Sequence, residues 1–169
     1  AVYMNAGAHG GAMSDVLVRS RAFDTSKMEI VTLDAKEHNF DYRKSVYMNR
    51  EELICLGATF QLVNAPRTEI EQKMSENTQK RRATQPIEAF SAGSYFKRPE
   101  GDAAGRLIDV CGLKGFFVGG ASVSEKHAGF VINNGNATFE DVISLEEYIV
   151  KSVYEQTGVT LHREVEIIR

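Results

Sequence analysis

Apolar and polar positions alternate in several short runs of the first half of the chain, and these runs predict β-strands. Val16 to Phe23 and Met28 to Leu33 alternate, and Leu53 to Val63 is rich in residues that favour strands. The polar and aromatic stretch between residues 34 and 48 predicts a loop with a helical turn. The first half is therefore expected to contain a small sheet.

A helix is predicted after Pro66, because proline suits the first helical turn, and it should run to about Arg82. Gln85 precedes Pro86, and a residue before proline disfavours helical geometry, so the helix should end there. We place a domain boundary at this point. The predicted domains are residues 1–85 and 86–169.

The second half mixes helices and strands. Thr138 and Asp141 have the spacing of a capping box, and Gly158 suits the C-terminal cap of the long helix between them. The apolar residues of this helix recur at helical spacing and should form its buried face: Val142, Leu145, Ile149 and Val153. The other predicted elements are a loop bearing Ser94, a helix over 103–111, strands near 116–118, 122–123 and 130–133, and a last strand over 161–168. The order of elements predicts an α+β fold.

Composition excludes some partners. The chain has 169 residues and a formal net charge of −3, so it offers no general basic field for nucleic acid. No apolar run approaches the ~18 residues of a membrane helix, so we expect no membrane partner, no signal peptide and a cytoplasmic location. Cys55 and Cys111 lack metal-ligand spacing, which predicts buried thiols and no metal site.

The segment from Phe90 to Asn136 contains candidate residues for ligand binding and proton transfer. It places the hydroxyl of Ser94 beside glycine, follows it with the cations Lys97 and Arg98, and continues into a second basic, glycine-rich stretch. This combination indicates a pocket for an anionic, phosphate-bearing ligand next to a potential proton donor. We therefore expect an enzyme.

Several strings in this order resemble a known family. They are GSYFKRPEG, AGRLID, CGLKGF, VGGASVSEKHAGFVIN, NGNAT and GVTLHREVEII, with NAGAHGGAMSDV and FDYRKS nearer the start. The whole chain is similar to the UDP-N-acetylenolpyruvoylglucosamine reductases, the MurB family. The resemblance implies the C-terminal part of an FAD-binding α+β domain in 1–85, followed by a small α+β UDP-sugar-binding domain in 86–169.

The resemblance also implies the reaction, that of a UDP-N-acetylmuramate dehydrogenase in peptidoglycan precursor synthesis. NADPH reduces FAD, and hydride then passes to the vinyl carbon of UDP-N-acetylglucosamine enolpyruvate, which becomes UDP-N-acetylmuramate. Negative charge develops next to a carboxylate, so the site needs fixed positive charge and a positioned acid. The substrate is a small molecule, and a monomer is expected.

Three residues match the catalytic positions of the family. Arg43 would clamp the substrate carboxylate, and Ser94 would deliver a proton to the carbanionic carbon. Glu164 would complete the site and should be protonated in the working complex, because it faces a carboxylate. Taken alone, Arg43, Ser94 and Glu164 are better interpreted as a surface ion pair, a turn residue and a strand-surface charge, and the matching motifs reverse this preference.

The resemblance assigns the binding residues as well. The flavin contacts would be Asn5, Ala6, Gly7 and Tyr42, whereas His9 stands where a tyrosine is more usual. Arg82, Lys97 and Arg98 would bind the diphosphate and uridine, although Arg98 replaces an asparagine of some relatives, and Arg82 also suits a solvated helix end. His127 is expected to be a structural hydrogen-bonding residue.

The resemblance implies a further, preceding half that cradles the FAD pyrophosphate. This chain alone is therefore expected to bind FAD weakly or not at all. Two alternatives remain open: a non-catalytic UDP-sugar-binding fragment, and another flavin-dependent oxidoreductase of the same architecture. Calorimetry with UDP-N-acetylglucosamine and turnover tests on simple alcohols would separate these from the reductase.

Overall fold

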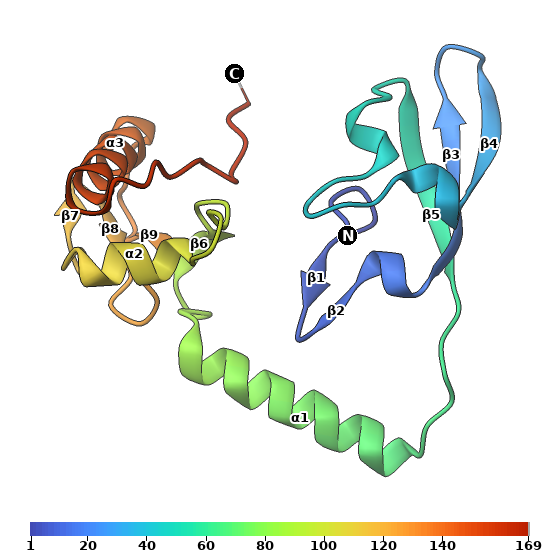
Figure 1. The fold of residues 1–169 in the computed structure, drawn as a ribbon, viewed down its shortest axis with the longest axis horizontal. Helices are drawn as coiled ribbons and strands as arrows, with labels where there is room; N and C mark the ends of the chain where they lie inside the picture. Colours follow the sequence, from blue (N-terminus) through green and yellow to red (C-terminus); the bar gives the residue numbers. More distant parts are fainter. Residues whose placement is uncertain (169) are drawn as a thin grey trace. The chain divides into compact units, whose positions relative to one another are not determined.

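The computed structural model describes residues 1–168, and the chain forms two compact units (Figure 1). One unit is Ala1–Lys73 and the other begins at Met74, so that the division falls within helix α1 (Arg67–Thr84). No helix among the described residues is long and apolar enough to span a bilayer. The predicted boundary between residues 85 and 86 follows directly after α1 and stays a prediction.

The first unit is built on an antiparallel three-stranded sheet of order β4-β3-β5. Its strands are β3 (Leu17–Asp24), β4 (Glu29–Asp34) and β5 (Leu53–Phe60). Two short strands, β1 (Gly7–Ala8) and β2 (Gly11–Ala12), form a separate hairpin near the start of the chain. The three predicted strands are confirmed, and the loop between β4 and β5 contains two short 3₁₀ helices, Ala35–His38 and Val46–Met48.

A buried polar cluster lies in the core of the first unit. The Ser20 hydroxyl is 3.0 Å from His38 Nε2 and 2.6 Å from the Tyr47 hydroxyl, and Phe40 stacks on the imidazole. Burial lowers the pKa of His38 below its ordinary 6.5 and raises that of Tyr47 to about 12. Because Ser20 bonds to both His38 Nε2 and the Tyr47 hydroxyl, the sheet can cover a core that is not wholly apolar.

Helix α1 is mostly polar and has no buried residue, and its two large apolar side chains, Ile70 and Met74, are exposed. Such a helix depends on local interactions rather than on packing. Arg67 and Glu71 form one pair at i,i+4 spacing with 2.7 Å between nitrogen and oxygen, and Arg81 donates to the side chain of Gln85. The Pro66 carbonyl accepts the first helical amide bonds, which confirms the predicted start of the helix.

The second unit is a four-stranded antiparallel sheet packed with two helices. The strand order is β6-β9-β8-β7, from β6 (Phe90–Ser94), β9 (Phe130–Asn133), β8 (Ala121–Val123) and β7 (Phe117–Val118). The helices are α2 (Ala104–Val110) and α3 (Phe139–Thr157). Helix α3 contacts β7, β8 and α2. The predicted α+β class is confirmed.

Helix α3 anchors the core of the second unit. Thr138 and Asp141 form the predicted capping box, and Gly158 closes the helix in the left-handed conformation. Leu145, Ile149 and Val153 are completely buried among residues from β8, β9 and α2. At about 1.5–3 kcal/mol for each buried aliphatic side chain, this face contributes much of the stability of the unit.

Three sequence predictions are wrong. Residues 90–94 form strand β6 rather than a loop. The short sequence FSAGS does not predict a strand, and pairing with β9 stabilises the extended conformation. Residues 161–168 form no strand and make a single bridge, between Arg163 and Phe96, because no further strand pairs with them. Cys55 is exposed and Cys111 is partly buried, and both are free thiols.

Candidate functional site

In the first unit, the opening segment is bound to the turn that carries Tyr42 and Arg43. Asp41 and Lys44 form a two-way backbone bridge, which closes a tight turn with Tyr42 and Arg43 at its tip. The Asn5 side chain donates to the Asp41 carbonyl over 3.1 Å and accepts from the Ser14 amide over 2.9 Å. One side chain therefore joins the predicted flavin-contacting segment to the turn that carries the predicted catalytic arginine.

Arg43 occupies an unusual backbone conformation. Its φ is +52°, in the left-handed region that non-glycine residues seldom adopt. Its guanidinium carbon lies 5.3 Å from the ring centre of Tyr42, within cation–π distance, and Tyr42 itself is 56% exposed. Strained backbone of this kind costs of order 1–3 kcal/mol and is concentrated at functional sites.

In the second unit, Ser94 lies at the exposed end of β6, beside a bulge. Ser91 pairs with Ile132 and Ser94 with Phe130, so β6 has one residue more than β9 in this interval. Gly93, with φ of +91°, absorbs the bulge. Bulges change the direction of a strand and often lie next to functional sites, so this one sets the direction of Ser94.

Tyr95, directly after Ser94, makes backbone hydrogen bonds to two different segments of the chain. The Tyr95 amide donates to the Gly129 carbonyl over 2.8 Å, and its carbonyl accepts from the Glu164 amide over 2.9 Å. The Lys97 amide donates to the His162 carbonyl over 2.8 Å. The segments that carry Ser94 and Glu164 therefore lie side by side.

Next to this pairing lies a partly buried network that sequence reasoning missed. The Tyr95 hydroxyl donates to Glu146 Oε2 over 2.8 Å, and Arg163 Nε donates to Glu146 Oε1 over 2.9 Å. Glu146 is only 9% exposed, and burial, with the neighbouring carboxylate, raises the pKa of Tyr95 well above its usual value. One signal was present in the sequence: Glu146 shares the apolar face of α3 with Val142 and Ile149.

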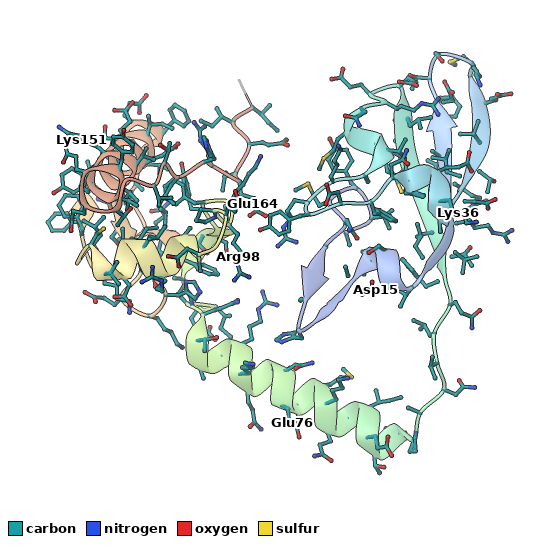
Figure 2. The ribbon with its side chains drawn as sticks, in the orientation of Figure 1. Asp15, Lys36, Glu76, Arg98, Lys151 and Glu164 are labelled. Atoms are coloured by element: carbon teal, nitrogen blue, oxygen red, sulfur yellow. The ribbon has the colours of Figure 1, made fainter. Side chains whose placement is uncertain are left out.

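The predicted substrate-binding cations are all exposed. Arg98 Nε donates to the Asp102 carbonyl over 3.1 Å, at the turn that precedes α2. Figure 2 shows Arg98 and Glu164 within the second unit. Arg82 lies in the last turn of α1, where its carbonyl accepts a hydrogen bond from the Lys126 ammonium. Arg82 and Lys126 therefore form a local concentration of positive charge.

His127 is confirmed as a hydrogen-bonding residue within its turn. Its Nδ1 accepts from the Gly129 amide over 3.1 Å, and its ring meets Phe130 edge-on. Gly105 leaves room for this ring, because a Cβ there would lie 3.0 Å from the imidazole. The same turn contains Gly129, whose carbonyl accepts the hydrogen bond from the Tyr95 amide. The turn therefore holds the segment of Ser94 next to β9.

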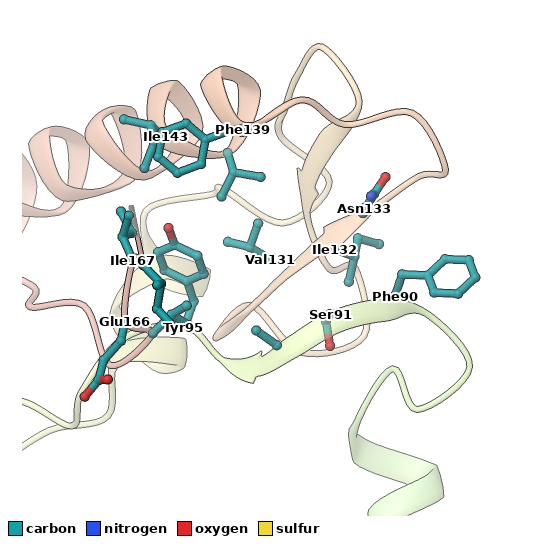
Figure 3. Close-up of a pocket in the computed structure, with 14 residues that line it drawn as sticks. Phe90, Ser91, Tyr95, Val131, Ile132, Asn133, Phe139, Ile143, Glu166 and Ile167 are labelled. Atoms are coloured by element: carbon teal, nitrogen blue, oxygen red, sulfur yellow. The ribbon is translucent and has the colours of Figure 1, made fainter.

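An apolar cavity of about 360 Å³ lies between β6, β9, the start of α3 and the C-terminal segment (Figure 3). Tyr95 lines it, with its hydroxyl directed towards α3, and Val131, Phe139, Ile143 and Ile167 surround the ring. Ser91 and Ala92 of β6 also line the cavity, whereas Ser94 does not.

The predicted residues therefore form two groups. Asn5 contacts the Tyr42–Arg43 turn in the first unit, and the segments of Ser94 and Glu164 pair in the second. Within residues 1–168, no cluster of three or more His, Cys, Asp or Glu side chains is placed to hold a metal ion.

Comparison with known proteins gives a consistent result. Residues 85–168 match the family model described as UDP-N-acetylenolpyruvoylglucosamine reductase, C-terminal domain. A reductase of that name from Caldanaerobacter subterraneus is 48% identical over 168 residues, and one from Bacillus velezensis is 46% identical over 169. Each alignment covers 99% of this chain and 55% of the relative, so the chain spans about half the length of the curated relatives it matches.

A solved structure is also similar. The crystal structure of UDP-N-acetylenolpyruvylglucosamine reductase (MurB) from Thermus caldophilus aligns with a TM-score of 0.83 and 36% sequence identity. The alignment covers 98% of this chain and 58% of that chain. The similarity in sequence and in structure therefore extends through both units.

Proposed function

Because this chain belongs to the UDP-N-acetylenolpyruvoylglucosamine reductase family, we propose that it supplies the substrate-reducing machinery of such an enzyme. The substrate would be UDP-N-acetylglucosamine enolpyruvate and the product UDP-N-acetylmuramate, a precursor of peptidoglycan. We assign FAD as the cofactor, NADPH as the reductant and the cytoplasm as the location.

The first unit fits one edge of a flavin ring. Both strands of the β1–β2 hairpin consist of glycine and alanine, and they are largely exposed, so backbone groups can approach a flat ligand closely. Asn5, Ala6 and Gly7 precede or begin this hairpin, and Tyr42 offers a half-exposed aromatic ring. When bound, the flavin would supply hydride to the vinyl carbon of the substrate.

Ser94 would supply the proton. Hydride addition at the terminal carbon leaves an electron pair on the adjacent carbon, and the new C–H bond there requires a proton from the protein. A serine hydroxyl is a weak acid, so it can act only when fixed close to that strongly basic carbon. Its position beside the Gly93 bulge, with Tyr95 held on both sides, provides that fixation.

Arg43 and Glu164 would stabilise the negative charge of the substrate carboxylate. The planar guanidinium can bind the substrate carboxylate with two hydrogen bonds and offset the charge that spreads into it. Glu164, as a neutral acid, would donate a hydrogen bond to the same carboxylate rather than repel it. The positions of Arg82, Lys97 and Arg98 suit the diphosphate and uridine, because exposed cations can form charge-assisted bonds with phosphate oxygens.

The observation that carries this proposal is the hydrogen bond between Glu164 and Tyr95, which brings the two predicted acids into neighbouring segments. The test uses the natural protein that contains this chain, purified with its flavin. It should oxidise NADPH through repeated turnovers only when the enolpyruvyl nucleotide is present, and it should yield UDP-N-acetylmuramate, identified by mass. Binding of the nucleotide without turnover, or turnover of a simple alcohol instead, would refute the proposal.

A further inference from the structure

Glu146 connects the two segments that carry the proposed acids. One of its carboxylate oxygens accepts from Tyr95, the residue directly after Ser94, and the other accepts from Arg163, the residue directly before Glu164. A single side chain thus bonds to the immediate neighbours of both. The two backbone segments are themselves paired, with Phe96 opposite Arg163.

Glu146 is fixed more firmly than either segment. It lies on helix α3 between Leu145 and Ile149, both of which are completely buried. The segments themselves are less well anchored: Ser94 ends a strand at a bulge, and Glu164 follows an isolated bridge. The helix is therefore the rigid reference to which both segments are attached.

A buried carboxylate is a poor source of stability. Glu146 is 9% exposed, whereas the side chain of Arg163 is 33% exposed. Removing a carboxylate from water is costly, and apolar residues of similar volume often stabilise a core equally well or better. Glu146 stands on an otherwise apolar helix face, where Val142, Ile149 and Val153 pack into the core. The position would suit a leucine if packing alone mattered, which points to a role in geometry.

We propose that Glu146 is a positioning residue: it sets the relative placement of Ser94 and Glu164 through Tyr95 and Arg163. This inference rests on the proposed function for its catalytic consequence. Proton delivery depends on distance, and a displacement of about 1 Å can cost as much as 10²-fold in rate. Of the three proposed UDP-binding cations, Lys97 lies in the linked segments, whereas Arg82 and Arg98 lie outside them. Binding of the UDP group should therefore change less than proton delivery.

The test uses the natural flavin-loaded protein with four variants. Glu146→Leu removes both links and should lower kcat for the enolpyruvyl nucleotide at least ten-fold, with its KM changed less than three-fold. Glu146→Gln can accept from Arg163 and donate to the Tyr95 hydroxyl, so it should recover at least half of that loss on a logarithmic scale. Tyr95→Phe breaks one link and should lie between parent and Glu146→Leu. Glu147→Leu, at the exposed neighbouring position, is the matched control and should retain parental kcat.

A second measurement does not depend on turnover. Hydrogen exchange at the amides of Lys97 and Glu164, which form the pairing, should accelerate at least ten-fold in Tyr95→Phe and stay parental in Glu147→Leu. Parental kcat in Glu146→Leu, or parental exchange in Tyr95→Phe, would overturn the inference. A parent that fails to reduce the nucleotide overturns the proposed function instead, and the exchange experiment then still decides whether Glu146 positions the segments.

Discussion

The backbone amide of Glu164 donates a 2.9 Å hydrogen bond to the carbonyl of Tyr95. This bond pairs the segment after β6 with a stretch almost seventy residues later in the sequence. Glu164 and Ser94, which directly precedes Tyr95, are the two proposed acids of the second unit. Tertiary pairing brings their segments together, and Tyr95 and Arg163, one from each segment, also bind Glu146 on helix α3.

Replacing Glu164 tests whether it works as a neutral hydrogen-bond donor. Glutamine mimics a protonated carboxyl group in shape and can donate to the substrate carboxylate. Glu164→Gln should therefore keep kcat within about ten-fold of the parent, whereas Glu164→Ala should lose roughly 10²-fold. Steady-state kinetics with the enolpyruvyl nucleotide measure both. Glu166→Gln, at an exposed position two residues later, serves as the control, and equal losses in Glu164→Gln and Glu164→Ala would contradict this role.

Arg43→Asn separates the guanidinium from the backbone conformation. Asparagine tolerates a positive φ better than most residues, so the turn at φ +52° should persist. We expect kcat to fall about 10²-fold or more, since the developing charge loses its cation, while the unfolding temperature stays within a few degrees of the parent. Lys44→Asn changes the charge one position later and should keep kcat near the parental value. A kcat for Arg43→Asn close to that of Lys44→Asn would rule out the charge-stabilising role.

Gly93→Ala tests the bulge before Ser94. A Cβ at Gly93 would meet no atom within 4 Å, so any effect comes from its φ of +91°. The strain should cost about 1–3 kcal/mol in the free energy of unfolding, and relief of it by rotation of the backbone should also lower kcat. Urea unfolding and kinetics measure the two effects.

Gly57→Ala is the matched control for that experiment. Gly57 also has open space around its Cβ position, but it lies within β5 and has no positive φ. The free energy of unfolding of Gly57→Ala should remain within about 1 kcal/mol of the parent. Similar destabilisation by both substitutions would show that the conformation of Gly93 is not the cause.

The buried His38 should make stability depend on pH. Its folded pKa lies below the ordinary 6.5 because of burial, with Glu37 and the backbone of Leu33 opposing the shift. The unfolded chain therefore binds more protons than the folded one as the pH falls below about 6.5, so stability falls in that range and is fully present above it. Urea unfolding at about pH 5.5 and pH 7.5 measures the difference.

His38→Gln should lose this part of the pH dependence, although it will also be less stable at both pH values because it disturbs the contacts with Ser20 and Phe40. His9→Gln alters an exposed imidazole and should keep the parental dependence. If the parent and His38→Gln lose the same free energy on acidification, His38 is not the group responsible.

Local signals in the sequence were sufficient for the elements that local interactions define. Helix α3 was predicted because Thr138, Asp141 and Gly158 cap it and its apolar residues follow helical spacing. Strand β6 was missed, since its order depends on pairing with β9, and the C-terminal segment was predicted as a strand although only one bridge holds it. Cys55 is predicted to be buried, but it is exposed within β5.

The candidate residues were identified through family resemblance, and their arrangement required the structure. Nothing in the spacing of Tyr95, Glu146 and Arg163 predicts that they meet, because 51 residues separate the first two and 17 the last two. A buried glutamate on an apolar helix face was the one available clue, since such a charge requires partners. Sequence patterns could indicate the need for a partner but could not identify it.

The central claim, that Ser94 donates the proton in the reduction of an enolpyruvyl nucleotide, is tested most directly by comparing Ser94→Ala with the parent in a rapid-mixing experiment. The natural protein is first reduced by NADPH and then mixed with the nucleotide. We predict that Ser94→Ala accepts electrons from NADPH at the parental rate but passes them to the nucleotide at least about 10²-fold more slowly, whereas Ser91→Ala reacts like the parent. Equal rates of nucleotide reduction in Ser94→Ala and the parent would contradict the account.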